Sequence, residues 1–412
     1  MSFLSNGKYN QGSGKIPTSK AVQDSDDYRR PRKIHRTSCS ITNLPSDCLN
    51  LIFKCLETRG DHTKTRDDRN SFGLTCRQWL HIQNNNHESL WYDNNFGPGK
   101  YPKISPKCFT KVLSKLLVRF QHLKYLSLKR CPGITDYITL KSQYFGSKVQ
   151  HLELDCWHEY SNIELSIVFS WFPRLTNISL KHTQITDKGL DALAKYCSSL
   201  ETVDLTNCQS STDKDLEALA KSCSSLKHVT LSGCRSITDS GLNVLLQNCR
   251  ELVSLCIYSC SKITGIGFSE CPKTLTYLGA QRCKLKPEGI KAIISGEGLE
   301  YLSLSALGPI NTDTVVTISK GCPYLKHLKL DGCEEVELEG WEAIGRNCKH
   351  LESLQVYQCE KLCDLGLQAL CNGCSKLSRF VVDCDNNSFS RSALDLYMRK
   401  KPGVIKLVYE ED

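Results

Sequence analysis

The amino-acid sequence predicts an α/β solenoid, with parallel strands inside and helices outside, preceded by a small all-α unit. A strand-and-helix pattern recurs from residue 123 onward, and a short apolar segment, NLPSDCLNLIF, stands ahead of it. The chain has 412 residues, which is longer than one hydrophobic core usually grows. An extended repeat accounts for both the length and the recurrence.

The repeats are defined by eleven segments written like LKYLSL, aligned on their fourth residue. These anchor residues are Leu126, Leu152, Ile178, Val203, Val229, Leu255, Leu278, Leu302, Leu328, Leu354 and Phe380. Successive anchors lie 26, 26, 25, 26, 26, 23, 24, 26, 26 and 26 residues apart. This spacing is typical of leucine-rich repeats, which supply one strand and one helix per unit. Because no unit can cover its own apolar strand face, the units must stack.

The second half of each unit reads as a helix. In QITDKGLDALAKYC and SITDSGLNVLLQNC, Thr186 and Thr238 precede Asp187 and Asp239. Oxygens of such residues accept hydrogen bonds from the free amides at a helix start. Apolar residues then recur at helical spacing, so we predict helices that begin at these positions.

Most of the 24 cysteines fall at two fixed places in the repeat. One group follows the strands: Cys131, Cys156, Cys208, Cys234, Cys260, Cys283, Cys333, Cys359 and Cys384. The other group closes the helices: Cys197, Cys223, Cys249, Cys271, Cys322, Cys348 and Cys374. Small, weakly polar thiols suit tight interior turns, so we interpret these cysteines as packing residues.

A zinc site is the alternative for one group of cysteines, Cys359, Cys363, Cys371 and Cys374, which includes a Cys-x-x-Cys pair. Cys359 and Cys374 should flank a predicted helix at opposite ends, which opposes convergence on one ion. No secretory signal opens the chain, so we expect reduced, metal-free thiols.

The apolar segment at the N-terminus, LPSDCLNLIF, is followed by DRNSFGLTCRQW, with an apolar face of its own. Two or three short helices over about 40 residues are too small to bury such residues alone, so they need a partner. Together with the cysteine-containing repeats, these segments resemble the F-box/leucine-rich-repeat family, and SFGLTCRQWLHIQN, ITGIGFSECPKTL and GWEAIGRNC look closest to its plant members.

The resemblance implies that the F-box docks onto the Skp-type adaptor of a cullin-based (SCF) ubiquitin ligase. By position, the implied adaptor-binding residues are Leu44, Pro45, Leu49, Ile52, Phe53 and Trp79. The alternative is that these six form the core of a cap on the solenoid, since repeat arrays need capping units. A charged insertion, TRGDHTKTRD, also makes the F-box segment longer than the family pattern.

The predicted domains follow from these boundaries. They are a disordered polar and basic tail (1–40), the F-box (41–83), a helical linker and N-terminal cap (84–122), the repeat array (123–403), and a C-terminal cap strand with an acidic tail (404–412).

Catalysis by the chain itself is not predicted. The sequence lacks a Gly-x-x-x-x-Gly-Lys phosphate loop, a His-Glu-x-x-His zinc helix and a Gly-x-Ser-x-Gly elbow. We therefore expect no cofactor and no catalytic residue. The net charge of +9 comes partly from the local run RRPRKIHR, so we expect no nucleic-acid partner. The sequence has no run of about 18 apolar residues, and we expect no membrane partner. The expected location is the nucleus, the cytoplasm or both, with RRPRKIHR as a possible import signal.

The implied function is substrate recognition for the ligase, with a protein substrate on the concave face of the repeats. Strand alternation places six aromatic side chains on that face, and we predict that they bind substrate: His228, Tyr258, Tyr277, Tyr301, His327 and Tyr357. There are two alternatives. The first is an interaction scaffold that belongs to no ligase, and the second is a hormone-type small-molecule co-receptor. The second would need a basic floor for an inositol phosphate, as in the plant hormone receptors that the family includes.

The basic and acidic residues of the same face nearly balance. The basic positions are Lys129, Lys181, Lys329 and Arg379. The acidic positions are Glu153, Asp155, Asp204, Asp331 and Asp383. Four basic residues offset by five acidic residues do not form a phosphate-binding site, so we expect no inositol phosphate on this face.

Overall fold

The computed structural model describes residues 77–93, 105–131, 148–156, 161–305, 310–332, 334–383 and 389–408. The chain divides into two compact units, Met1–Pro45 and Ser46–Asp412, and every described residue belongs to the second unit. The F-box residues Leu44, Pro45, Leu49, Ile52 and Phe53 therefore lie outside the described residues.

The second unit is built on one parallel sheet in which strands pair in chain order, from β1 to β13. These strands are β1 (Ser89–Asp93), β2 (Tyr125–Lys129), β3 (His151–Glu153), β4 (Asn177–Ser179), β5 (Thr202–Asp204), β6 (His228–Thr230), β7 (Ser254–Cys256), β8 (Tyr277–Gly279), β9 (Tyr301–Ser305), β10 (His327–Asp331), β11 (Ser353–Tyr357), β12 (Arg379–Asp383) and β13 (Ile405–Val408).

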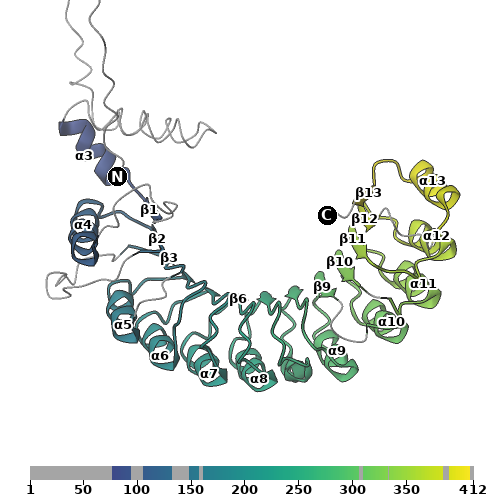
Figure 1. Cartoon of the computed structure of the whole chain (residues 1–412), viewed down its shortest axis with the longest axis horizontal. Coiled ribbons are helices and arrows are strands. Elements are labelled where there is room, and N and C mark those ends of the chain that lie inside the picture. Colours follow the sequence, from purple (N-terminus) through teal and green to yellow (C-terminus); the bar gives the residue numbers. More distant parts are fainter. Residues whose placement is uncertain are drawn as a thin grey trace, which may run out of the picture. The chain divides into compact units, whose positions relative to one another are not determined.

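Helices lie along one side of this sheet, as Figure 1 shows for α5 to α13. The helices are α3 (Arg77–Asn86), α4 (Pro106–Arg119), α5 (Asn162–Ser170), α6 (Asp187–Tyr196), α7 (Asp213–Ser222), α8 (Asp239–Asn248), the 3₁₀ helix η2 (Ile266–Glu270), α9 (Pro287–Ile294), α10 (Thr312–Gly321), α11 (Leu338–Asn347), α12 (Asp364–Gly373) and α13 (Arg391–Lys400). None of the helices in the described ranges is both long and apolar enough to cross a membrane.

The eleven predicted anchors form one row across the sheet, each paired in register with the next from Leu126 to Phe380. Each of them is at most 2% exposed. Strand residues alternate between two faces, so the anchors point toward the helices and their neighbours point to the opposite, open face. The predicted leucine-rich-repeat solenoid is therefore confirmed.

Two elements differ from the simple repeat pattern. β1 extends the sheet ahead of the first predicted strand, within the segment that we predicted as a helical linker and N-terminal cap, and its Leu90 pairs with Leu126. In the shortest repeat, which has 23 residues between Leu255 and Leu278, the 3₁₀ helix η2 replaces an α-helix. Gly265 immediately precedes η2 and has a φ of 94°, a conformation that favours glycine.

Neighbouring repeats are joined at their helix starts. Thr186 occupies the predicted cap position of α6, but its side chain makes no capping bond and instead accepts a hydrogen bond from the Asn162 amide of the preceding helix. Asp239 accepts hydrogen bonds from the next repeat, including the Thr264 hydroxyl at 2.8 Å. The helix-start residues thus link repeats as well as cap helices.

The cysteines of the repeat pattern pack between turns. Cys333 and Cys384 lie outside the described residues, and the other members are buried except for Cys156 and Cys271, which are half-buried. Strand-following thiols donate to carbonyls of the previous repeat: Cys208 to Leu180 (3.0 Å), Cys234 to Leu205 (3.1 Å), Cys260 to Leu231 (3.0 Å) and Cys283 to Ile257 (2.8 Å). Their placement fits the predicted packing role.

Candidate functional site

The open face of the sheet is the candidate functional surface, because the helices cover the other face. Three side chains of each repeat lie on it: the residue before the anchor, the residue after it, and the residue two positions further on. Along β2 to β5 this face is charged, and along β7 to β10 it is aromatic.

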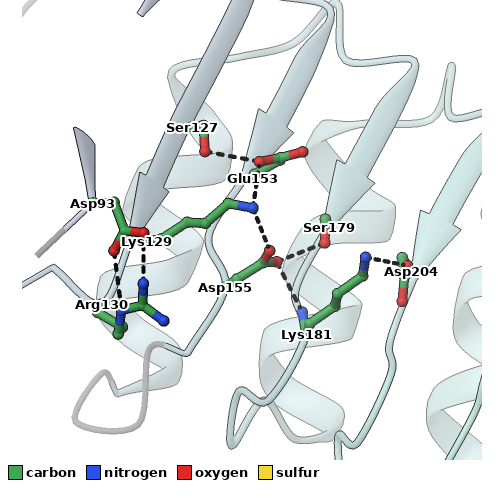
Figure 2. Close-up of polar contacts among 9 residues, drawn as sticks. All are labelled: Asp93, Ser127, Lys129, Arg130, Glu153, Asp155, Ser179, Lys181 and Asp204. Carbon is green, nitrogen blue, oxygen red and sulfur yellow. Dashed lines mark hydrogen bonds and ion pairs between the residues drawn. The ribbon is translucent and has the colours of Figure 1, made fainter. Parts of the chain in front are cut away.

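The charged part consists of ion pairs between adjacent strands (Figure 2). The ammonium nitrogen of Lys129 lies 3.1 Å from a Glu153 carboxylate oxygen and 3.2 Å from one of Asp155. The ammonium nitrogen of Lys181 lies 3.1 Å from a carboxylate oxygen of Asp204. Each of these lysines therefore has an acidic partner within the protein.

Hydrogen bonds tie the acidic groups of this region further to the strands. Ser127 donates to Glu153 at 2.8 Å, and Ser179 donates to Asp155 at 2.6 Å. Burial alone would raise the pKa of Glu153, but hydrogen bonds from Tyr125, Ser127 and Lys129 outweigh burial and lower it. The carboxylate is thus held in its charged form.

These contacts bear on the inositol-phosphate alternative. Lys129 and Lys181 are engaged with carboxylates, and a phosphate would have to displace those partners. Lys329 lies on the far side of the aromatic part, with its ammonium nitrogen 5.9 Å from the centroid of the Tyr357 ring. Lys129 and Lys181 are thus separated along the sheet from Lys329 on β10.

The aromatic part brings four of the six predicted substrate residues together. The rings of Tyr277 and Tyr301 stack with centroids 4.0 Å apart and planes 11° apart. The hydroxyl of Tyr258 lies 3.2 Å from that of Tyr277, and the His327 ring lies 6.0 Å from Tyr301. We call these four residues the aromatic cluster.

Gly279 sets the position of Tyr258 in the cluster. A side-chain carbon added at Gly279 would lie 2.5 Å from the Tyr258 hydroxyl oxygen, because the phenol ring lies against the Gly279 backbone. Burial raises the pKa of Tyr258 to about 12, and burial with hydrogen bonds from Tyr258 and Tyr301 raises the pKa of Tyr277. At neutral pH these phenols remain protonated and can donate hydrogen bonds.

The other predicted site residues lie apart from the aromatic cluster. In the strand register Ser254 separates His228 from Tyr277. Tyr357 pairs in register with Asp331 and so belongs to a different row from Tyr301. Trp79, the one predicted adaptor residue that is described, is half-buried in α3.

A second aromatic group at the other end of the sheet was missed from the sequence. Trp91 on β1 is 66% exposed, and its ring lies 5.8 Å from that of Tyr125, which in turn lies 6.1 Å from His151. The alternating residues of SLWYD could have predicted this strand. It was missed because Leu90 precedes Leu126 by 36 residues, which is outside the repeat spacing.

Many of the described cysteines are buried, and burial lowers their reactivity. Burial raises the pKa of Cys249 and Cys283 to about 12, so these thiols stay protonated and weakly nucleophilic at neutral pH. The part of the chain that the structure describes contains no group of three or more His, Cys, Asp or Glu side chains placed to hold a metal ion. This includes the described cysteines of the candidate zinc set.

A match to a family model agrees with the repeat architecture. A family model described as Leucine Rich repeat matches residues 175–194 and 222–246. Among solved structures, the complex of Rad7 and Elc1 in yeast contains a chain with a TM-score of 0.38 and 15% identity, covering 90% of this chain and 98% of that one.

Curated plant proteins provide the sequence relationship. GRR1-like protein 1 of Arabidopsis thaliana is 23% identical over 156 residues, which cover 38% of this chain and 22% of that protein. F-box/LRR-repeat protein 12 of Arabidopsis thaliana is 40% identical over 309 residues, which cover 74% of this chain and 70% of that protein. With this identity over more than two thirds of both proteins, the chain belongs to the F-box/LRR-repeat family.

Proposed function

We propose that this chain is the substrate-recognition subunit of an SCF-type ubiquitin ligase. Its F-box, with Leu44, Pro45, Leu49, Ile52, Phe53 and Trp79 as the contact residues, would bind a Skp-type adaptor and, through it, a cullin. The open face of the sheet would bind a protein substrate. The family membership supports the adaptor half of this proposal.

The observation that carries the substrate half is the aromatic cluster. Side chains from consecutive repeats, with Tyr277 and Tyr301 stacked at 4.0 Å, meet on a face that the helices leave uncovered. Tyrosine is enriched at interface hot spots because its ring offers a large contact area at a low cost in conformational entropy. His228 and Tyr357 would then contact the substrate at the margins of the surface.

The chain would act by positioning alone. Holding the substrate and the ligase on one chain raises the effective concentration of substrate lysines near the ubiquitin-charged carrier enzyme. No bond is made or broken by a group of this protein, so its contribution is binding and orientation. We therefore propose no catalytic residue and no cofactor.

Affinity capture tests the proposal. The tagged chain, isolated from plant cells with and without a proteasome inhibitor, should recover the adaptor and cullin in both samples and additional proteins only with the inhibitor. Recovery of partners without any adaptor would support the scaffold alternative instead. Partner binding that required an added small molecule would support the co-receptor alternative.

A matched pair of variants tests the substrate face. Tyr277→Ala should reduce recovery of the inhibitor-dependent proteins while leaving adaptor recovery unchanged. Tyr125→Ala alters a tyrosine in the same row of the sheet but at β2, and it should leave both unchanged. Equal losses with the two variants would contradict the assignment of substrate binding to the aromatic cluster.

A further inference from the structure

The loops that follow β6, β7 and β8 form a basic edge of the sheet. They comprise residues 231–238, 257–265 and 280–286, and they contain no aspartate or glutamate. The basic residues of these loops are all exposed: Arg235, Lys262, Arg282, Lys284 and Lys286. We call these five residues the basic rim. Because no acidic residue lies among them, the basic rim is a candidate site for an anionic partner.

Most of the basic rim lacks an acidic partner within the protein. The four rim residues other than Arg282 form no ion pair within the described ranges, whereas Lys129 and Lys181 on the strand face are engaged with carboxylates. Two acidic residues lie in the first turns of the helices that follow. Asp239 of α8 is half-buried and bonded to amides of the next repeat, and Glu288 of α9 is exposed. With five basic residues against these two acidic ones, the edge keeps a net positive charge.

Hydrogen bonds between successive loops hold the backbone of the basic rim in place. The Gly233 amide donates to the Tyr258 carbonyl at 2.7 Å, and the Ser259 amide donates to the Gln281 carbonyl at 2.8 Å. The phenol oxygen of Tyr258 lies 3.2 Å from that of Tyr277. Tyr258 thus belongs both to a loop of the basic rim and to the aromatic cluster, so the two surfaces adjoin.

The positive edge is short. Neighbouring strands lie about 4.8 Å apart, so three successive loops span about 10 Å. Two strands further on, the loop after β10 has exposed acidic residues, Glu334, Glu335 and Glu337. A nucleic acid, which typically contacts a protein through about six or more phosphates, would extend beyond the basic rim toward this acidic loop. A short peptide segment fits the length, since about three extended residues cover 10 Å.

The cations of the basic rim are distributed over the loops. Arg235 and Arg282 lie on the first and third loops, and the second loop between them contributes Lys262. A single phosphate group is bound best by donors that converge on its oxygens, such as a bidentate arginine. Cations on three separate loops instead match separate carboxylates placed along an extended chain.

We infer that the basic rim binds an acidic segment of the substrate, in which unmodified aspartate or glutamate side chains pair with the rim lysines and arginines. This inference rests on the proposed substrate-receptor function and specifies the chemistry that the substrate presents. Residues that flank the acidic ones would reach the aromatic cluster at Tyr258. Charge complementarity at such an exposed surface speeds association and confers specificity.

Peptide selection on the full-length chain tests this inference. A random library of peptides of about twelve residues, displayed on phage, is screened in parallel against the parent and against the double variant Lys262→Glu, Lys284→Glu. We expect the parent to enrich peptides with several aspartates or glutamates, and the double variant to lose them. Enrichment of basic or uncharged peptides by the parent, equal enrichment by both proteins, or no enrichment would overturn the inference.

The most enriched acidic peptide, labelled with fluorescein, then serves as the probe in fluorescence anisotropy. Lys262→Glu, Lys284→Glu should weaken its binding about tenfold, because two attractive contacts become repulsive. The matched control Lys291→Glu, Lys320→Glu makes the same change in charge at exposed lysines in the last turns of α9 and α10, and it should change binding by less than about twofold. Glu288→Gln should strengthen binding. Equal losses in the two double variants, or no gain with Glu288→Gln, would count against the basic rim.

Unlabelled competitors identify the anion. The same peptide with glutamine and asparagine in place of its acidic residues should not compete, and raising the salt from about 0.05 M to about 0.5 M should weaken binding strongly. A phosphoserine version of the peptide and a single-stranded RNA should compete no better than the acidic peptide. Stronger competition by either of them would overturn the choice of carboxylates as the ligand groups.

Peptide binding and adaptor recovery are measured separately, so this inference and the proposed function can fail independently. Adaptor recovery by a chain that binds no acidic peptide overturns the inference alone. Acidic-peptide binding at the basic rim by a chain that recovers no adaptor leaves the binding site standing and overturns the ligase role. Circular dichroism of each variant confirms that the array is folded.

Discussion

Replacing Asp239 by alanine should destabilise the array at the junction between α8 and η2. The Asp239 carboxylate accepts four hydrogen bonds from the next repeat. They come from the backbone amide (2.9 Å) and hydroxyl (2.8 Å) of Thr264, and from the amides of Gly265 (2.9 Å) and Gly267 (3.1 Å). This junction lies in the shortest repeat, where one carboxylate satisfies several amides at once.

The expected loss can be estimated from these bonds. A buried hydrogen bond to a charged group contributes about 1.5–3 kcal/mol to stability. Asp239 is half-buried, so in the variant water can bond to some of the released amides and the net loss per bond is smaller. We therefore expect Asp239→Ala to lower the free energy of unfolding by about 3 kcal/mol. Asp213 makes two such bonds, both to Thr238, so Asp213→Ala should cost about half as much.

Hydrogen exchange followed by mass spectrometry measures the effect locally, because long repeat arrays need not unfold in one step. Peptides that contain Gly265 and Gly267 should exchange much faster in Asp239→Ala, with little change at β2 or β12. Urea unfolding should rank the stabilities as parent, Asp213→Ala, then Asp239→Ala. An unchanged exchange rate at Gly265, or a larger loss from Asp213→Ala, would refute the reasoning.

Three other predictions concern titration, thiols and location. The pKa of Tyr258 is raised to about 12, so the protonated phenol adds folding stability that is complete below pH 10 and is lost as the pH rises toward 12. When the absorbance titration of Tyr258→Phe is subtracted from that of the parent, the difference should show one phenol ionising near pH 12; ionisation near pH 10 would contradict the raised pKa. Alkylation of the denatured chain without reductant should modify all 24 cysteines, and protected thiols or bound zinc would contradict the reduced, metal-free state. Deleting residues 29 to 36 should shift a fluorescent fusion from the nucleus to the cytoplasm; an unchanged distribution would exclude RRPRKIHR as an import signal.

The anchors were predictable from the sequence because their spacing and apolar character are both local properties. The register from Leu126 to Phe380 follows directly from the repeat length, and it fixes which residues reach the open face. The addition of β1 was not predictable in the same way. Its Leu90 pairs with Leu126 across an interval of 36 residues, which does not match the repeat spacing of 23 to 26 residues.

Contacts between repeats were harder to foresee than positions within them. The cap position of Thr186 was predicted, but its bond to Asn162 depends on how two helices stack. Alternation predicted that Tyr258 faces outward, but its contact with Gly279 arises because the neighbouring strand lacks a side chain there. Such pairings depend on distances across the stack, which a single repeat does not encode.

Adaptor co-purification tests the central claim, that this chain is a ligase subunit, most directly. The parent chain and the double variant Leu44→Ala, Pro45→Ala are each co-expressed with a plant Skp-type adaptor, with Tyr277→Ala as a control whose change lies in the array. We predict stoichiometric adaptor with the parent and with Tyr277→Ala, and none with the double variant, although its array melts like that of the parent. Stoichiometric adaptor on the double variant would contradict the F-box assignment, and no adaptor on the parent would contradict the ligase role itself.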